Sequence, residues 1–339
     1  MKSYAGIDLH GTNSVIVVLD DDDRVLYQQR LRNELAGILA AFAPFRETLQ
    51  GIAVESTYNW YWLVDGLMDA GDVMHLAHVP ALPQYSGLKY ADDQHDARWL
   101  AHLLRLGLLP TGHMYPKADR PLRDLLRKRG QWVRQKTAVV LSLQSLLARL
   151  TGQRFSLNQI RQLTPAAVAA LVPAPEHELS VTSSLTVLRC VEAQITEVER
   201  AVRAQAGPRP GFALLQTVTG IGPTLASTIL LETGDIWRFT TVGQFASYCR
   251  CVSSQYLSNG KRKGAGNTKS GNKYLSWAFF EAAHFAIRYD PLIRRFYQRK
   301  AARTAEFVAL KAVAHKLARA CYHMLRDQVP FQVTHAFAA

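Results

Sequence analysis

The chain has 339 residues, of which 48% are hydrophobic and 20% are charged, so it is long enough for two or three globular domains. It contains no run of about 18 apolar residues, and Met1-Lys2 leads directly into an apolar stretch. This pattern predicts a cytoplasmic protein with no membrane partner. Its four cysteines are too few and too scattered for a disulfide framework or a zinc site, which predicts reduced thiols.

The charge is distributed unevenly along the chain. Residues 1–115 carry 8 Lys and Arg against 14 Asp and Glu, a net charge of −6, whereas residues 116–339 carry 32 against 13, a net charge of +19. An acidic part joined to a strongly basic part indicates a polyanion-binding surface on the second part. The alternative is an ordinary basic protein with no nucleic-acid partner.

The first 115 residues predict an α/β domain, because short strand-like stretches are followed by segments with helical spacing of apolar residues. The expected strands are 4–10, 14–19, 25–31, 51–55 and 72–77, and the expected helices are 34–49, 60–70 and a helix from 93 onward. The acidic run 20–23 resembles a metal site. We leave it out, because consecutive acids at a hairpin tip are usually solvated turn residues.

Four carboxylates occupy positions that converge in a ribonuclease-H-like α/β layout. Asp8 lies within an apolar strand, Glu55 ends a neighbouring strand, and Asp93 and Asp96 share one face of the first turn of a helix. Acids in a first turn also suit the helix dipole, so capping alone could explain the last two. Gathered carboxylates need cations, and two Mg²⁺ ions could activate a nucleophile against a phosphodiester. Asp92 remains an alternative to Asp93, since it would also share a helix face with Asp96.

The middle of the chain, residues 116–206, predicts a helical hairpin or coiled coil. A long helical pattern extends to residue 150, and a second one covers about 176–205. One interpretation is an ordinary packed helix with a solvated basic face. We favour a helix that contacts both another protomer and nucleic acid, and its expected nucleic-acid-binding residues are Arg123, Arg127, Lys128 and Arg134.

Residues 207–339 predict a mainly α-helical domain. It begins with a Gly- and Pro-rich linker at 207–211, which marks the domain boundary. The Gly-Ile-Gly stretch at 220–222 favours a helix-hairpin-helix-like motif, whose backbone N–H groups can face phosphates, although a simple tight turn is the alternative. Residues 258–273 hold five cations, four glycines and no acid, which predicts a mobile phosphate-binding loop. The expected nucleic-acid-binding residues here are Lys261, Arg262, Lys263, Lys269, Lys273, Arg294, Arg295 and Arg299.

The N-terminal motifs resemble those of a known family. Gly-Ile-Asp at 6–8, Glu55, and Lys89 before Asp93-x-x-Asp96-Ala resemble the RuvC-like domain of the DEDD transposases of bacterial insertion sequences. In that family the four acids bind metal and are catalytic, which implies a Mg²⁺ site at Asp8, Glu55, Asp93 and Asp96. The family pattern favours Asp93 over Asp92.

The C-terminal motifs are similar to the second domain of the same family. The Gly-Ile-Gly turn, Ser258-Asn-Gly-Lys and Lys269-x-Gly-Asn match its pattern, and the nucleophilic serine falls on Ser258. Ser258 as a plain turn residue is the alternative. The resemblance implies a RuvC-like domain at 1–115, a helical oligomerisation region at 116–206 and a serine-containing domain at 207–339.

The resemblance implies a recombinase that excises and inserts an insertion sequence, guided by a noncoding bridge RNA. It further implies donor and target DNA as partners, a homodimer or homotetramer, and association with the nucleoid during the reaction. Two alternatives belong to other functional classes. A structure-selective nuclease such as a Holliday-junction resolvase would need the four acids without Ser258, and a noncatalytic DNA-binding protein would need only the basic helices.

Overall fold

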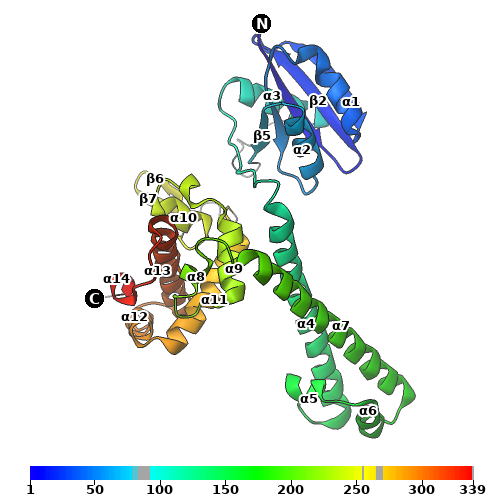
Figure 1. Cartoon of the computed structure of the whole chain (residues 1–339), viewed down its shortest axis with the longest axis vertical. Coiled ribbons are helices and arrows are strands. Elements are labelled where there is room, and N and C mark those ends of the chain that lie inside the picture. The colour runs from blue at the N-terminus through cyan, green and yellow to red at the C-terminus, as the bar shows by residue number, and fades with distance from the viewer. Residues whose placement is uncertain (79–80, 82–91, 254–255, 265–269, 338–339) are drawn as a thin grey trace. The chain divides into compact units, whose positions relative to one another are not determined.

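The computed structural model describes residues 1–78, 81, 92–253, 256–264 and 270–337 (Figure 1). The chain divides into two compact units, Met1–Lys117 and Ala118–Ala339. Each unit is described by itself. Two residues of the sequence motifs, Lys89 and Lys269, lie outside the described residues.

The first unit is built on a mixed five-stranded sheet with the strand order β3-β2-β1-β4-β5 (Figure 1). The central strand β1 pairs antiparallel with β2 and parallel with β4, and β4 pairs parallel with β5. The strands are β1 Ser3–Leu9, β2 Asn13–Asp20, β3 Val25–Arg32, β4 Leu49–Glu55 and β5 Met74–Ala77. The predicted α/β class of the N-terminal part is therefore confirmed.

Helices cover both faces of this sheet. On one face, α1 (Leu35–Phe42) and α2 (Tyr61–Asp69) bury an apolar core against the strands. On the other face, α3 (Asp93–Arg105) packs Ala97 and Ala101 against the valines of β2. The predicted helix 34–49 was too long, because α1 ends at Phe42 and a 3₁₀ turn containing a proline follows.

Gly6 of β1 permits an unusually close approach of α3. A Cβ atom at Gly6 would lie 2.0 Å from the carbonyl oxygen of Ala97 and 2.7 Å from the amide nitrogen of Ala101. Both neighbours are backbone atoms of a helix, so they cannot move aside independently. Glycine at this position therefore sets the distance between α3 and the central strand.

The acidic turn at 20–23 has a structural role that the sequence prediction missed. Asp20 is only 4% exposed, and its carboxylate accepts the amide N–H groups of Asp22 and Arg24 at 2.9 and 2.8 Å. Asp23 lies 2.9 Å from Nδ1 of His102 and 3.1 Å from Nε of Arg105, both in the last turns of α3. The prediction that these acids are merely solvated was wrong for both residues, which instead order the turn and fix α3 to it.

The second unit is mostly helical, as the sequence predicted. Its longest elements are α4 (Arg120–Thr151) and α7 (Pro175–Ala206), which pack together along an apolar seam with the short helices α5 (Leu157–Arg161) and α6 (Pro165–Leu171) at one end (Figure 1). The remaining helices are α8 Phe212–Leu215, α9 Pro223–Thr233, α10 Val242–Tyr248, α11 Lys273–Tyr289, α12 Pro291–Ala301, α13 Glu306–Asp327 and α14 Val333–Phe337.

One continuous core joins the base of the long hairpin to these C-terminal helices, because Leu122 of α4 and Val202 of α7 belong to it. The turn between α8 and α9 packs tightly on α11. Gly220 has a φ of +97°, and a Cβ there would lie 2.5 Å from the carbonyl oxygen of Ala282. Packing therefore demands this glycine, and the helix-hairpin-helix character of the turn stays a prediction.

The segment from Tyr256 to Gly264 forms a hairpin that the sequence analysis did not predict. β6 (Tyr256–Ser258) and β7 (Lys261–Gly264) form a hairpin in which Ser258 is opposite Lys261. Its two turn residues, Asn259 and Gly260, have φ angles of +51° and +69°. Positive φ at both positions is the type I′ pattern that Asn-Gly favours. The structure thus places a hairpin at the start of the expected loop, and the mobility and phosphate binding of that loop stay predictions.

Two further observations concern the whole described chain. No helix in the described segments is long and apolar enough to cross a membrane. All four cysteines are free thiols, as the sequence predicted, and three of them are buried.

We predict that Gly6→Ala destabilises the first unit, because the new methyl group overlaps the backbone of α3. An overpacked site of this kind should cost about 3 kcal/mol in the free energy of unfolding. The matched control is Gly37→Ala, in the middle of α1, where a Cβ meets nothing within 4 Å and helix propensity should add about 0.5–1 kcal/mol. Guanidinium unfolding followed by circular dichroism checks both changes. Equal midpoints for the two variants would contradict the prediction.

Candidate metal centre

Asp8 lies near the carboxyl end of the central strand β1 and is only 6% exposed. A carboxylate at this depth is costly to ionise without a compensating charge. Burial raises the pKa of Asp8, whereas the positive charge of His10 lowers it and the negative charges of Asp93 and Asp96 raise it further. β1 thus holds a buried acid whose pKa is affected by the charges of two acids from α3.

Glu55 is the last residue of β4, which runs parallel to β1 with Val54 opposite Ile7. The carboxyl ends of parallel neighbours meet at one edge of a sheet, so Glu55 and Asp8 lie at the same edge. Burial raises the pKa of Glu55, and the charges of Asp8 and Asp96 raise it as well.

The first turn of α3 supplies the other two acids. Asp92 is the N-cap of this helix, and its carboxylate accepts the amide N–H of His95 at 2.8 Å. Asp93 and Asp96 follow within the first turn. Burial raises the pKa of Asp96, with the charge of Asp93 adding to the effect. The geometry assigns helix capping to Asp92 and brings Asp93 and Asp96 into the cluster of acids.

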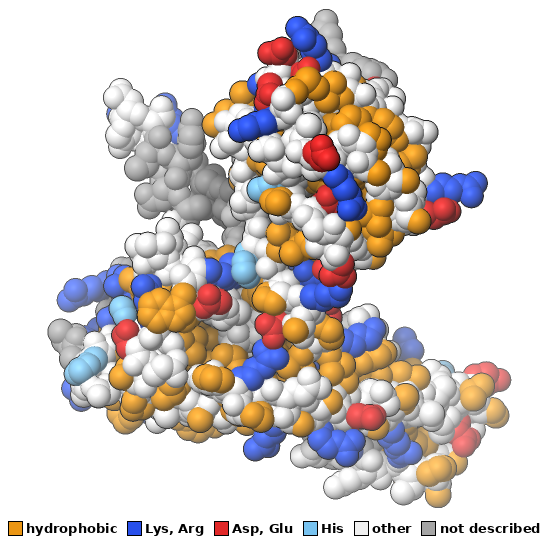
Figure 2. Space-filling model, turned by 45° about the horizontal axis from the view of Figure 1, so that its top comes forward, with side chains coloured by type: hydrophobic (Ala, Val, Ile, Leu, Met, Phe, Trp, Pro, Cys, Tyr) orange, Lys and Arg blue, Asp and Glu red, His pale blue; other side chains and the backbone are white. Residues whose placement is uncertain are grey.

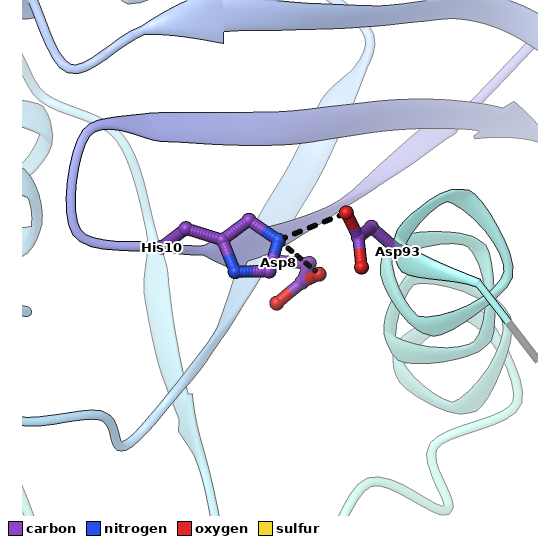
Figure 3. Close-up of side chains that lie close together, drawn as sticks. All are labelled: Asp8, His10 and Asp93. Carbon is purple, nitrogen blue, oxygen red and sulfur yellow. Dashed lines mark ion pairs between the residues drawn. The ribbon is translucent and has the colours of Figure 1, made fainter.

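His10 and Arg30 lie in this cluster, although the sequence analysis did not select them. Nε2 of His10 is 3.0 Å from a carboxylate oxygen of Asp8 and 3.2 Å from one of Asp93 (Figure 3). Nη2 of Arg30, on β3, is 2.5 Å from Asp93, and this hydrogen bond is the main cause that lowers the pKa of Asp93. The guanidinium of Arg30 therefore offsets part of the negative charge, and the imidazole of His10 lies between two of the acids.

The place of His10 in the site could have been predicted from the sequence. His10 follows Asp8 by two positions, and side chains two apart in an extended segment point to the same side. Arg30 carries no such signal, since its position depends on the register of β3 against β2, in which Arg30 is opposite Val15.

The donor set suits a hard divalent cation. Ligand atoms of Asp8, His10 and Asp93 all lie within 4.8 Å of one another. Carboxylate oxygens are the ligands that Mg²⁺ prefers, and a divalent cation would relieve the repulsion that raises the pKa values of Asp8, Glu55 and Asp96. Of the four acids, Asp8 and Asp93 lie within this 4.8 Å distance together with His10, whereas Glu55 and Asp96 are not part of that close group and interact with Asp8 electrostatically.

Ser258 belongs to the second unit, where it ends β6 and is exposed. The hairpin register places it opposite Lys261. Lys263 on the neighbouring strand is also exposed. An exposed hydroxyl on an ordered hairpin with two exposed cations beside it is accessible to an anionic ligand.

The four basic residues of α4 that were expected to bind nucleic acid differ in how exposed they are to a phosphate. Arg123 is 6% exposed, so burial contradicts its assignment as a phosphate contact. Arg127 makes two hydrogen bonds to the buried carboxylate of Glu232, at 2.7 and 2.8 Å, so its charge is already compensated. Lys128 and Arg134 are exposed.

Among the C-terminal candidates, Arg294 is engaged within the protein. Its guanidinium donates to the carbonyl oxygen of Ile287 at 3.0 Å and to that of Arg288, which caps the end of α11. Exposed cations remain elsewhere on the unit, and Figure 2 shows Lys and Arg side chains interspersed with hydrophobic ones. The other exposed candidates are Lys261, Lys263, Lys273, Arg295 and Arg299.

Comparison with known proteins gives consistent matches at both ends of the chain. A transposase model of the IS110 DEDD type matches residues 5–151, and a model described as the transposase IS116/IS110/IS902 family matches residues 212–298. The chain belongs to the DEDD transposase family of insertion sequences. The resemblance seen in the sequence is thereby confirmed. The first match contains all four acids and the second contains Ser258.

Individual relatives cover different shares of the chain. A probable family 20 transposase of Pseudomonas aeruginosa is 27% identical over 229 residues, which are 65% of this chain and 68% of that protein. An uncharacterised 43.6 kDa protein of insertion element IS110 from Streptomyces coelicolor is 30% identical over 149 residues, which are 44% of this chain and 36% of that protein. The transposase for insertion sequence element IS1111A of Coxiella burnetii is 20% identical over 290 residues, which are 84% and 78% of the two chains.

We predict that Asp8→Asn stabilises the metal-free protein at pH 7, because it removes a charge whose folded-state pKa is raised. An acid with a raised pKa keeps its proton longer in the folded state than in the unfolded state. Its ionisation therefore lowers stability as the pH rises above about 4, the ordinary pKa of Asp. The melting temperature of the wild type should fall more steeply over this range than that of Asp8→Asn.

Mg²⁺ should raise the melting temperature of the wild type and have little effect on Asp8→Asn, since the variant lacks the buried ligand. The control is Asp22→Asn, an exposed acid of the β2–β3 turn, which should behave like the wild type. An equal response of all three proteins to Mg²⁺ would exclude the site.

Proposed function

We propose that this chain is a transposase that cuts DNA at the ends of an insertion sequence and joins them to a new site. One observation carries the proposal: the partly buried Asp8 and Glu55 lie at one edge of the sheet, and α3 brings Asp93 within 4.8 Å of Asp8. Burial, together with neighbouring acids, raises the pKa values of Asp8 and Glu55. Such a cluster is unfavourable for stability alone and is typical of a functional site. Membership of the DEDD transposase family gives the reaction class.

We assign Asp8, Glu55, Asp93 and Asp96 as the ligands of Mg²⁺, with two ions as the expected number. When bound, the metal would polarise a phosphate and increase the acidity of an attacking hydroxyl or water. The protein's own contribution is rigidity. β1 and β4 hold Asp8 and Glu55 on the sheet, while His10 and Arg30 orient Asp93.

Ser258 is the proposed nucleophile of strand transfer. Its hydroxyl oxygen forms an ester bond to phosphorus, the bond from phosphorus to the departing deoxyribose oxygen breaks, and the hydroxyl proton passes to that oxygen. Serine is a weak nucleophile at neutral pH, so the reaction depends on stabilising the charge of the pentacovalent phosphate. Lys261, opposite Ser258 in the hairpin, and Lys263 are cations that can meet this charge.

DNA is the proposed substrate, and we further propose a noncoding guide RNA that selects donor and target. The net charge of +19 over residues 116–339 is compatible with both polyanions. Asp8 and Ser258 belong to different compact units of the chain. We therefore propose a homodimer or homotetramer in which the acids of one protomer act with Ser258 of another.

The four-acid assignment predicts that Asp96→Ala abolishes Mg²⁺-dependent strand cleavage. Asp92→Ala is the matched control, because it removes a neighbouring carboxylate whose hydrogen bond caps α3. Its cleavage should persist, with a loss of about 1 kcal/mol of stability from the missing cap. Cleavage of a labelled insertion-sequence end by the two variants measures this. Loss of cleavage in Asp92→Ala at full helix content would show that Asp92 and not Asp93 completes the site.

The nucleophile assignment predicts that Ser258→Ala binds nucleic acid normally but forms no covalent protein–DNA adduct. The control is Ser253→Ala, an exposed serine whose hydroxyl lies 3.5 Å from Nζ of Lys311 and which should still form the adduct. Denaturing gels and mass spectrometry locate the modified residue. Cleavage by Ser258→Ala without an adduct would favour the structure-selective nuclease instead.

A further inference from the structure

A pocket of about 630 Å³ opens between α4, α9 and α11 of the helical unit. This volume lies within the range of small-molecule binding sites. Hydrophobic and aromatic side chains share its lining with four basic residues and Glu232. The pocket belongs entirely to the second unit, so its shape does not depend on how the two units are placed.

The floor of the pocket is polar and held by hydrogen bonds. Glu232 is 1% exposed, and its two carboxylate oxygens accept Nε and Nη2 of Arg127 at 2.7 and 2.8 Å. Nδ2 of Asn272 donates to the same carboxylate at 2.7 Å. Asn272 is also the N-cap of α11, where its side-chain oxygen accepts the amide N–H groups of the first turn. The three helices are therefore tied together before any ligand arrives.

One wall of the pocket is aromatic. The guanidinium carbon of Arg127 lies 4.5 Å from the ring centre of Tyr274, so the intramolecular pairing already occupies one face of this ring. Trp277 follows one helical turn later and is 43% exposed. A large flat indole that remains partly exposed beside a preformed pocket is a surface for stacking.

The rim carries positive charge that the protein does not compensate. Arg127 is paired with Glu232, and Arg129 with Glu199. Arg134 and Lys273 are exposed, and no ion pair to either of them is found among the described residues. Lys273 Nζ lies 5.3 Å from the ring centre of Tyr274, so this cation already touches the aromatic wall. An aromatic wall beside two exposed cations without a carboxylate partner among the described residues fits a ligand that has a flat, uncharged part and an anionic part.

We propose that this pocket takes one unpaired nucleotide of a single-stranded segment. The base stacks on Trp277, and the adjoining phosphates contact Arg134 and Lys273. A base within a duplex is already stacked on both faces and paired along one edge. Only a single-stranded or extruded nucleotide can therefore enter the pocket. The inference rests on the proposed function only in taking nucleic acid as the partner, and it adds a strand-selective site that is independent of the four acids.

The test measures the affinity of Trp277→Ala for a labelled single-stranded oligonucleotide and for a duplex of the same length by fluorescence anisotropy. Loss of one base–aromatic stack should weaken single-strand binding by about 5- to 150-fold. Duplex binding should change by less than about twofold, since phosphate contacts elsewhere dominate it. Trp277→Phe should retain most of the single-strand affinity, because phenylalanine still offers a ring face.

The matched control is Trp237→Ala. This tryptophan is 62% exposed, and its ring lies 4.5 Å from the guanidinium of Arg326, away from the pocket lining. Its removal should leave single-strand binding unchanged. A second variant, Lys273→Gln, should reduce the salt slope of single-strand binding by about 0.7, the contribution of one phosphate contact.

Two results would overturn the inference. Either Trp277→Ala retains its single-strand affinity, or it loses single-strand and duplex binding equally. Capture of a protein partner through Trp277 with unchanged oligonucleotide binding would assign the pocket to that partner instead. Asp8→Ala should keep the full single-strand preference, so a failure of the proposed catalytic site and a failure of this pocket give different results.

Discussion

The close approach of α3 to the central strand is the constraint on which the candidate site depends. With no side chain at Gly6, the backbone of α3 at Ala97 can reach β1 at a distance that any Cβ would forbid. Asp93 lies one turn before Ala97 on the same helix and Asp96 directly precedes it, so this contact also fixes their placement relative to Asp8. The Asp23 pairs with His102 and Arg105 secure the other end of α3. A packing contact thus determines the geometry of an electrostatic site.

This geometry explains why the acids occur together with His10 and Arg30. Asp8, Glu55 and Asp96 repel one another at a partly buried edge, and burial makes each charge more costly. Arg30 compensates at Asp93, whose pKa is lowered mainly by their hydrogen bond, and His10 lies close to both Asp8 and Asp93. The remaining excess of negative charge is what a divalent cation would neutralise.

Much of the first unit could be predicted from sequence, because strand periodicity and the acids at strand ends are local signals. The spacing of the acids left Asp92 open beside Asp93, which only the family pattern favoured, because spacing does not show which carboxylate turns back to cap α3. Arg30 was missed because it reaches Asp93 only through the register of β3. The Asn259-Gly260 dipeptide did carry a hairpin signal, but the abundance of glycine and cations favoured a loop instead. In α4, the spacing of Arg127 could not reveal that Glu232, more than one hundred residues later, pairs with it.

The central claim is that the acid cluster binds divalent metal. Anomalous diffraction from crystals of the full chain soaked with Mn²⁺ tests it most directly. Mn²⁺ substitutes for Mg²⁺ and scatters X-rays anomalously. The account predicts an anomalous peak about 2.1 Å from carboxylate oxygens of Asp8 and at least one of Glu55, Asp93 and Asp96. Well-ordered crystals in which His10 still bridges Asp8 and Asp93, with no peak among the four acids, would contradict it.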